Sequence, residues 1–420
     1  MIGRDPENAA LYAYRATAWR YLGDIDRALS DYNESMRLGP TAYSLHGRAL
    51  IWSRKREYDK AIADYDEAIK LEPVHADLYH ERGVCWHAKG EFDRAIQDFS
   101  DALTLNPKFA EAYCLRGAAQ AAKRENGKAM ADYNDAIQLD PRLTIAYERR
   151  AILLYDNDEY KHAIADFDQA ILLQPDSPFF YNGRGSAWMA LGVNWKALED
   201  FDEALRLDPK FADPYANRGH ILLSAQKYDK AILEFNTALR MNPDFVRAYI
   251  SRGEVWRRKG RLENALQDQN DALRLDPNRV EAYYYRGAVW RDRREYGKAI
   301  EDYQSALRIK PGFSFATRGL ASLLATASDE KFRDASQALE MAEKSLAIDY
   351  ENPYGISAKA CALALAGDFE QAIQLETKAL ENRGFAESTL IDGGIHSQTR
   401  INCWKAKTLW LDNMDAVSTK

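Results

Sequence analysis

Apolar and small residues recur along this chain at helical spacing, in a pattern that returns about every 34 residues. In residues 79–107, for example, Tyr79, Gly83 and Trp86 share one face of a first expected helix. Ala95 and Phe99 share one face of a second expected helix. Each period therefore predicts two amphipathic helices, and each helix has one face to bury.

Prolines mark the period along most of the chain. Ten of the 13 prolines form a series with steps of 34 residues and a single step of 33, at positions 6, 40, 73, 107, 141, 175, 209, 243, 277 and 311. Two short helices cannot bury their apolar faces alone, so neighbouring units must stack on one another. The periodicity thus predicts an all-α solenoid.

The second expected helix carries a small–aromatic–small signature. Alanine fills the first small position of this signature, at 28, 61, 95, 129, 163, 197, 231, 265 and 299. An aromatic residue follows four positions later in eight of these nine units, and Gln269 is the departure. The chain resembles the tetratricopeptide repeat family, and its segment 323–349 resembles the closing part of bacterial-type multi-repeat arrays. The resemblance implies a right-handed superhelical solenoid of stacked antiparallel helix pairs.

The signature divides the chain into segments. Residues 1–8 read as the tail of an incomplete upstream repeat, which leaves an upstream extension open, and residues 9–313 as nine units. Residues 314–351 read as a degenerate tenth unit with a longer loop, and residues 352–384 as an eleventh unit. Residues 385–420 are expected to form a C-terminal capping segment.

Charged residues form two regular series within the repeats. Arginine holds one position of the first helix, at 15, 48, 82, 116, 150, 184, 218, 252 and 286. An acid holds one position of the second helix, at 31, 64, 98, 132, 166, 200, 234, 268 and 302. Both series lie beside the apolar stripe, where an unpaired charge is costly, so we expect repeated arginine–carboxylate pairs. The alternative is an arginine comb for phosphates or an acidic peptide, but nine matching acids leave little net field.

Composition and motifs argue against several classes of function. The net charge of −7 offers no overall field for nucleic acid, so nucleic acid is an unlikely partner. The four cysteines lack CxxC spacing, and the histidines lack HExxH spacing, so no metal site is expected. Nucleotide-binding and hydrolase motifs are absent, and the repeats leave no room for a separate catalytic domain. We therefore expect no catalytic residue, no cofactor and no enzyme activity.

Membrane insertion is not expected either. No apolar run approaches the ~20 residues of a spanning helix, and the first residues do not resemble a signal peptide. These observations predict a cytoplasmic protein, with an upstream signal or anchor left open. They say nothing about the oligomeric state.

The resemblance also implies where a partner binds, because the first helices of such repeats line a concave groove. In the middle units this surface maps to a mostly apolar set, predicted to bind a partner: Cys114, Ile145, Glu148, Ile152, Tyr155, Phe179, Asn182 and Met189. The structural alternative is that several of these side chains contact the adjacent unit. A second candidate is a basic rim that includes Arg257 and Arg291, which suits an acidic segment or a terminal carboxylate unless it is simply solvated.

The leading hypothesis is a protein–protein interaction scaffold that binds an extended peptide or helix of its partners. The Lys and Asn pattern of the carboxylate-clamp subfamily is absent, since positions such as Val84 and Leu115 are apolar. Chaperone-tail binding is therefore not predicted. Two alternatives remain open: a helical-repeat nucleic-acid-binding protein, and the regulatory arm of an enzyme truncated upstream.

Overall fold

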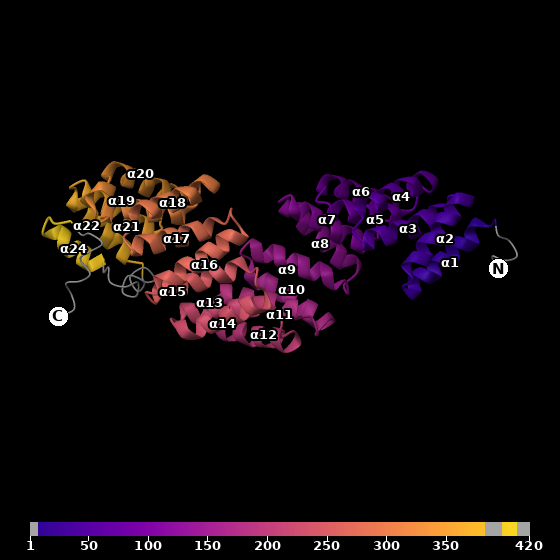
Figure 1. The fold of residues 1–420 in the computed structure, drawn as a ribbon, viewed down its shortest axis with the longest axis horizontal. Coiled ribbons are helices and arrows are strands. Elements are labelled where there is room, and N and C mark those ends of the chain that lie inside the picture. Colours follow the sequence, from indigo (N-terminus) through magenta and orange to yellow (C-terminus); the bar gives the residue numbers. More distant parts are fainter. Residues whose placement is uncertain (1–6, 383–396, 410–420) are drawn as a thin grey trace. The chain divides into compact units, whose positions relative to one another are not determined.

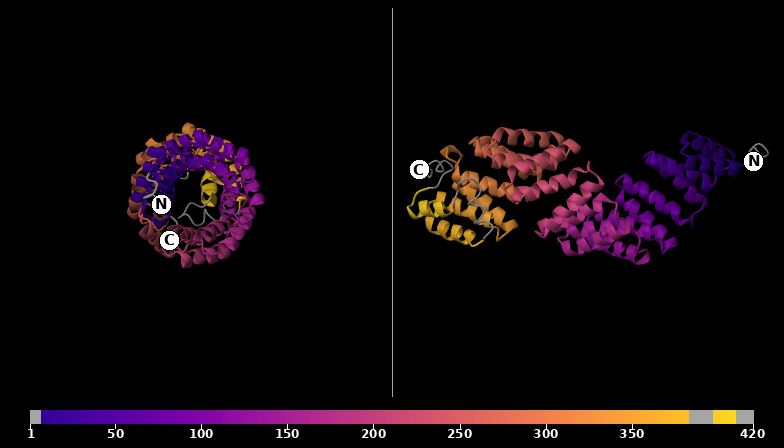
Figure 2. Two further views of the ribbon diagram at one scale, coloured as in Figure 1. Left: turned by 90° about the vertical axis from the view of Figure 1, so that its right-hand side faces the viewer. Right: turned by 90° about the horizontal axis from the view of Figure 1, so that it is seen from below.

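The structure, a computed structural model, describes residues 7–382 and 397–409. These residues form α-helices and one 3-10 helix, and no β-strand occurs among them (Figure 1). The chain divides into two compact units, Met1–Pro209 and Lys210–Lys420. Within each unit, successive helices pack as pairs and successive pairs stack side by side (Figure 2). The predicted all-α solenoid of stacked helix pairs is confirmed.

The first unit holds six helix pairs. Their bounds are α1 (Ala9–Leu22), α2 (Ile25–Leu38), α3 (Ala42–Arg54), α4 (Tyr58–Leu71), α5 (Ala76–Ala88), α6 (Phe92–Leu105), α7 (Ala110–Ala122), α8 (Asn126–Leu139), α9 (Thr144–Asp156), α10 (Tyr160–Leu173), α11 (Pro178–Ala190) and α12 (Asn194–Leu207).

The second unit continues the pattern and adds a C-terminal helix. Its elements are α13 (Ala212–Ser224), α14 (Tyr228–Met241), α15 (Val246–Arg258), α16 (Leu262–Leu275), α17 (Val280–Asp292), α18 (Tyr296–Ile309), α19 (Ser314–Thr326), η2 (Glu330–Phe332), α20 (Ala335–Ile348), α21 (Pro353–Leu365), α22 (Phe369–Leu380) and α24 (Ser397–Lys405). The odd-numbered helices up to α21 are the first helices of the pairs.

The tight turn inside each helix pair except α19–α20 places one residue in the left-handed backbone region. Gly90 takes this position between α5 and α6 with φ 79°. The neighbouring pair has Arg124 at the same place with φ 63°, although such a φ is unfavourable for a residue with a Cβ atom. The turn is therefore imposed by helix packing as well as by glycine.

The aromatic residue of the small–aromatic–small signature packs against a glycine of the first helix, and this glycine has a direct steric cause. A Cβ atom added to Gly117 of α7 would lie 2.9 Å from the ring of Tyr133 and 3.2 Å from the carbonyl oxygen of Ala129, both on α8. Only a residue without a side chain lets the two helices approach this closely while the ring fills the space between them.

The arginine and acid series pair as predicted. In the example of Arg150 and Asp166, Nε donates to Oδ2 and Nη2 to Oδ1, both at 2.7 Å. Nη1 donates to Oδ1 of Asn134 in the preceding pair at 2.6 Å. The hydrogen bond to Asp166, acting against burial, raises the pKa of Arg150. Each guanidinium thus ties two helices of one pair together, and here it also reaches the pair before.

The same bond recurs in all nine units. The other pairs are Arg15–Asp31, Arg48–Asp64, Arg82–Asp98, Arg116–Asp132, Arg184–Asp200, Arg218–Glu234, Arg252–Asp268 and Arg286–Asp302. These arginines are bonded to carboxylates inside the stack, so the series is structural and does not form a free comb for phosphates.

The series ends at the pair α19–α20. The position of the pairing arginine is the seventh residue of the first helix, and in α19 this residue is Leu320, which is buried. The seventh residue of α20 is Met341, which packs against the same core cluster. An apolar contact therefore replaces the ion pair, and the arginine of α19 stands two residues earlier, at Arg318.

Gln269 interrupts the buried aromatic series inside the second unit. Its side chain is fully buried, and Nε2 donates to the Ile250 carbonyl at 3.0 Å. Oε1 has no hydrogen-bond partner among the residues that the structure describes. Gly253 leaves room beside it, as Gly219 leaves room for the ring of Phe235 in the preceding pair. The site thus keeps the shape of an aromatic pocket but holds an amide that is only partly satisfied.

Replacing Gln269 with Phe is expected to raise the free energy of unfolding by about 1 kcal/mol, because it removes an unsatisfied buried carbonyl and fills the pocket with apolar surface. Urea unfolding followed by circular dichroism measures the change. The reverse substitution in the preceding pair, Phe235→Gln, is the control and should lower the midpoint. A lower midpoint for Gln269→Phe would show that the amide fits its site better than a ring does.

The C-terminal segment predicted over 385–420 is described only in part, since 385–396 and 410–420 lie outside the described residues. Within it, α24 packs against α22, and Ile401 and Trp404 are buried. Cys85, Cys114, Cys361 and Cys403 form no disulfide. In the part of the chain that the structure describes, no helix is both long and apolar enough to cross a membrane.

Candidate functional site

The residues predicted to line a groove in the middle units occupy a repeating set of helix positions. In α9, Ile145, Glu148, Ile152 and Tyr155 are the second, fifth, ninth and twelfth residues. Phe179, Asn182 and Met189 are the second, fifth and twelfth residues of α11. We call these four positions of the first helices the inner stripe.

In α9 and α11 the inner stripe is accessible at two of its apolar positions. Ile152 is 42% exposed and Phe179 is 61% exposed. Ile145 and Tyr155 are only partly exposed and pack against core clusters, and Met189 is partly exposed too. The stripe therefore presents a discontinuous apolar surface here.

Cys114 differs from its neighbours on the stripe. It is the fifth residue of α7 but only 1% exposed, and it packs with Ala129, Tyr133 and Leu153. Its short side chain does not reach beyond the contact between helices, so it belongs to the core and not to a partner-binding surface. The prediction of Cys114 as a contact residue is corrected on this ground.

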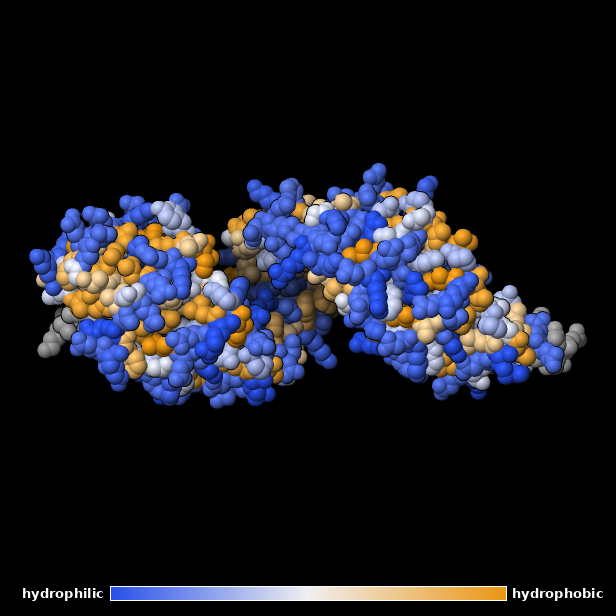
Figure 3. All heavy atoms as spheres, turned by 90° about the horizontal axis from the view of Figure 1, so that it is seen from above, coloured by the Kyte–Doolittle hydropathy of each residue, from blue (hydrophilic) through white to orange (hydrophobic). Residues whose placement is uncertain are grey.

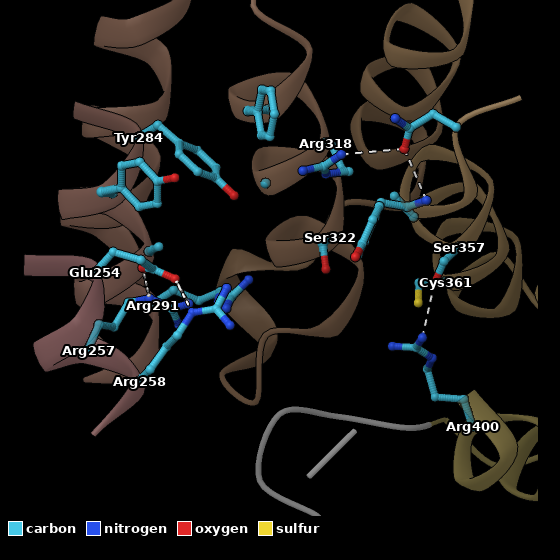
Figure 4. A pocket seen from close by; sticks show the side chains of 17 residues that line it. Glu254, Arg257, Arg258, Tyr284, Arg291, Arg318, Ser322, Ser357, Cys361 and Arg400 are labelled. Carbon is cyan, nitrogen blue, oxygen red and sulfur yellow. Dashed lines mark hydrogen bonds and ion pairs between the residues drawn. The ribbon is translucent and has the colours of Figure 1, made fainter. Parts of the chain in front are cut away.

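In the second unit the inner stripe lines a cavity of about 470 Å³ (Figure 4). Phe315 and Tyr354 are the second residues of α19 and α21, and Tyr284, Arg318 and Ser357 are the fifth residues of α17, α19 and α21. Because the first helices stack in register, equal positions from consecutive helices meet on one surface. Four first helices, α15 to α21, and the terminal helix α24 thus converge on one pocket.

The predicted basic rim forms one wall of this pocket, and its arginines are paired. Arg257 donates from Nε to Oε2 of Glu254 at 2.8 Å and from Nη1 to Oδ2 of Asp292 at 2.7 Å. Arg258 reaches Oε1 of Glu254 at 2.7 Å, and Arg291 lies 3.2 Å from Oδ1 of Asp292. Arg257 is therefore held at the contact between α15 and α17, and Arg291 is paired with Asp292 of its own helix, so neither is a freely solvated rim residue.

The charges of this network keep its acids ionised. Burial acts to raise the pKa of Glu254, but Arg257 and Arg258 outweigh burial and hold it below the ordinary value. Burial likewise acts against ionised Asp292, and the nearby arginines again lower its pKa. The wall therefore carries fixed charges of both signs.

An aromatic cluster stands beside the charged wall. The ring of Tyr284 lies 5.7 Å from that of Phe315 and 6.0 Å from that of Phe313. Burial, with a smaller effect of Glu254, raises the pKa of Tyr285 to about 12, so its hydroxyl stays protonated at neutral pH. The pocket can accordingly offer apolar contact and hydroxyl hydrogen bonds together.

The opposite wall comes from α21 and α24. Arg400 donates from Nη2 to Oγ of Ser357 at 3.0 Å and from Nε to Oε1 of Glu376 at 3.1 Å. Glu376 is fully buried, so this ion pair fixes α24 on the helices before it. The terminal helix is thus part of the pocket as well as a cover for the last helix pair.

The side-chain types that line this pocket are suited to ligand binding. Paired arginines, aromatic rings and hydroxyls recognise ligands, and the described residues contain no group of three or more His, Cys, Asp or Glu able to hold a metal ion. Elsewhere the face shown in Figure 3 is largely hydrophilic, with apolar residues in scattered patches. In the described part of the chain, the pocket is one place where apolar and charged groups of the inner stripe converge.

Sequence reasoning missed Arg318, Phe315 and Tyr354. One signal was present, because the Arg–Gly pair at 318–319 comes two residues early in the repeat register. This shift moves the arginine from the seventh to the fifth helix position, which belongs to the inner stripe.

Comparison with known proteins identifies the repeat. A model described as tetratricopeptide repeat matches residues 48–108, 88–143, 149–210 and 217–279, and another with the same description matches residues 280–313. The chain matches no curated protein.

Solved structures resemble the chain at low identity. The APC/C hetero-tetramer Cut9–Hcn1 is 15% identical, with 93% of this chain and 90% of that chain covered and a TM-score of 0.52. A monomeric IFIT1 mutant with Gppp-AAAA is 14% identical over 80% of this chain and 90% of its own (TM-score 0.50). Yeast Tom70 is 17% identical, with 95% and 96% covered and a TM-score of 0.48. At such identities the likeness concerns the fold alone, whereas the family models cover more than half of the residues: the chain belongs to the tetratricopeptide repeat family.

Proposed function

We propose that this protein is an interaction scaffold whose inner stripe binds an extended peptide segment of a partner protein. The observation that carries the proposal is the pocket of the second unit, where four consecutive first helices and α24 present aromatic and charged side chains to one cavity. The proposal involves neither catalysis nor a cofactor.

The form of the pocket supports a peptide over a compact ligand. Its lining runs across the stack, from Glu254 on α15 through Tyr284 and Arg318 to Ser357 on α21. A chain lying across these helices meets one stripe residue after another, as extended ligands of repeat proteins do. Phe315 and Tyr354, which are 46% and 38% exposed, supply the aromatic anchors on which peptide affinity usually depends.

A random peptide library displayed on phage tests the proposal without a known partner. The parent chain is expected to enrich peptides that lose about ten-fold or more in affinity for the double variant Phe315→Ser/Tyr354→Ser, because two anchors are removed. Trp195→Ser is the matched control, since Trp195 is 61% exposed on α12, a second helix. Circular dichroism of each variant is the check that the substitutions leave the helical fold intact.

The other outcomes are equally informative. Loss of binding in Ile152→Ser/Phe179→Ser, with the pocket variant unaffected, would place the peptide on the stripe of the first unit. Failure to enrich any peptide would contradict the proposal. Binding of random single-stranded RNA that weakens steeply with salt would favour the nucleic-acid alternative instead.

A further inference from the structure

Arg318 differs from the other arginines of the pocket. Arg257, Arg258, Arg291 and Arg400 each contact a carboxylate of Glu254, Asp292 or Glu376. Among the residues that the structure describes, Arg318 forms no ion pair, and its hydrogen bond to Oδ1 of Asn352 is long, at 3.4 Å. The same Oδ1 already accepts from the backbone N–H groups of Tyr354 and Gly355, as the cap of α21. A guanidinium has five N–H donors, so most of the donors of Arg318 are left for a ligand.

The guanidinium of Arg318 is nevertheless held in place. Its central carbon lies 4.8 Å from the ring centre of Phe315 and 4.8 Å from that of Tyr354. Contact with two aromatic rings orients a planar guanidinium and reduces the entropy lost when it bonds a ligand. The side chain lines the pocket between the aromatic cluster and Ser357 (Figure 4).

The charge of the pocket favours an anion at this point. Five arginines line it, and the described carboxylates bonded to them are Glu254, Asp292 and Glu376. Among the residues that the structure describes, arginines thus outnumber carboxylates at the pocket, although the whole chain has a net charge of −7. A local positive surplus in a partly enclosed, aromatic-walled pocket attracts an oxyanion more strongly than an exposed arginine does.

We infer that Arg318 is the anion-binding residue of the pocket and that it bonds an oxyanion carried by the peptide, as a carboxylate or a phosphate group. The inference rests on the proposed function. The rings of Phe315 and Tyr354 then contact the apolar part of the same segment, so the preferred peptide has an acidic or phosphorylated residue next to an apolar one.

Peptide mixtures with one fixed position test this inference. The fixed residue is Glu, phosphoserine, Gln or Ser within otherwise random sequence, and binding is measured by fluorescence anisotropy. The parent is expected to bind the Glu or phosphoserine mixture at least about ten-fold more tightly than the Gln and Ser mixtures, because a charge-assisted bond is lost in the latter. A preference for both anions assigns a general oxyanion site, whereas a preference for phosphoserine alone assigns a phosphate.

Two variants locate the effect. Arg318→Gln is expected to bind all mixtures alike, and Arg318→Lys to recover only part of the preference, because an ammonium lacks the planar fork. Arg308→Gln makes the same charge change on an exposed part of α18, outside the pocket, and should keep the full preference.

The failures are distinguishable. If the parent binds the mixtures without preferring an anion, the inference is wrong and peptide binding stands. A preference that persists in Arg318→Gln would also overturn the assignment of Arg318. If the parent binds none of the mixtures, the proposed function fails, and the inference fails with it.

Discussion

Replacing Arg150 with Met is expected to lower the free energy of unfolding by about 3 kcal/mol, because it leaves the carboxylate of Asp166 buried without its partner. Asp166 is only 5% exposed and accepts two hydrogen bonds from Arg150. The substitution also removes the bond from Arg150 to Asn134, which joins adjacent helix pairs. Urea unfolding followed by circular dichroism measures the loss, and hydrogen exchange shows whether α9 and α10 open first.

Two comparisons separate burial from charge. Arg206→Met breaks an exposed pair with Glu203 inside α12 and should change stability by about 0.5 kcal/mol or less. In the double variant Arg150→Met/Asp166→Leu no buried charge remains, so most of the lost stability should return. Equal urea midpoints for Arg150→Met and the parent would show that the pair does not stabilise the stack.

Replacing Arg400 with Met is expected to release α24 from the second unit. The substitution strands Glu376, which is fully buried, and removes the bond to Ser357 on α21. The substitution is expected to lower the free energy that holds α24 on the second unit by about 3 kcal/mol. A helix of nine residues is not stable by itself, so α24 has no intrinsic stability to offset this loss. Hydrogen exchange of residues 397–409 should therefore become faster while α13–α18 stay protected.

The apolar replacement is again the informative control. Arg400→Met/Glu376→Leu removes both charges and should restore slow exchange in α24, because Ile401 and Trp404 still pack in the core. Slow exchange in the single variant would show that apolar packing alone holds α24. If α24 is released, the pocket loses one wall, so peptides selected by the parent should also bind the single variant less tightly.

The proposed site lies on other first helices than the predicted one, but it uses the same positions within each helix. The middle-groove residues of α9 and α11 occupy the same helix positions as several pocket residues of α19 and α21. Family resemblance therefore pointed to the same face of the first helices that lines the pocket. It did not show which part of that face encloses a cavity, because this depends on the residues of several helices together.

The amino-acid sequence by itself determined the repeat, the helix pairs and the pairing of charges. Helical periodicity and the 34-residue spacing act locally, and each unit meets the same neighbours as the one before it. The partner of Arg150 could therefore be predicted from the series, since a regular arginine beside an apolar stripe needs an equally regular acid.

Which inner-stripe residues line a pocket followed only from the folded arrangement of several helices. This arrangement buried Cys114, paired Arg257 and Arg291 with acids, and brought Arg400 to Ser357 from 43 residues away. These outcomes depend on contacts that do not repeat, in particular the loss of the ion pair at α19 and the return of α24 onto the stack. A periodic pattern fixes what recurs in each unit, whereas the pocket arises where the period breaks and distant segments meet.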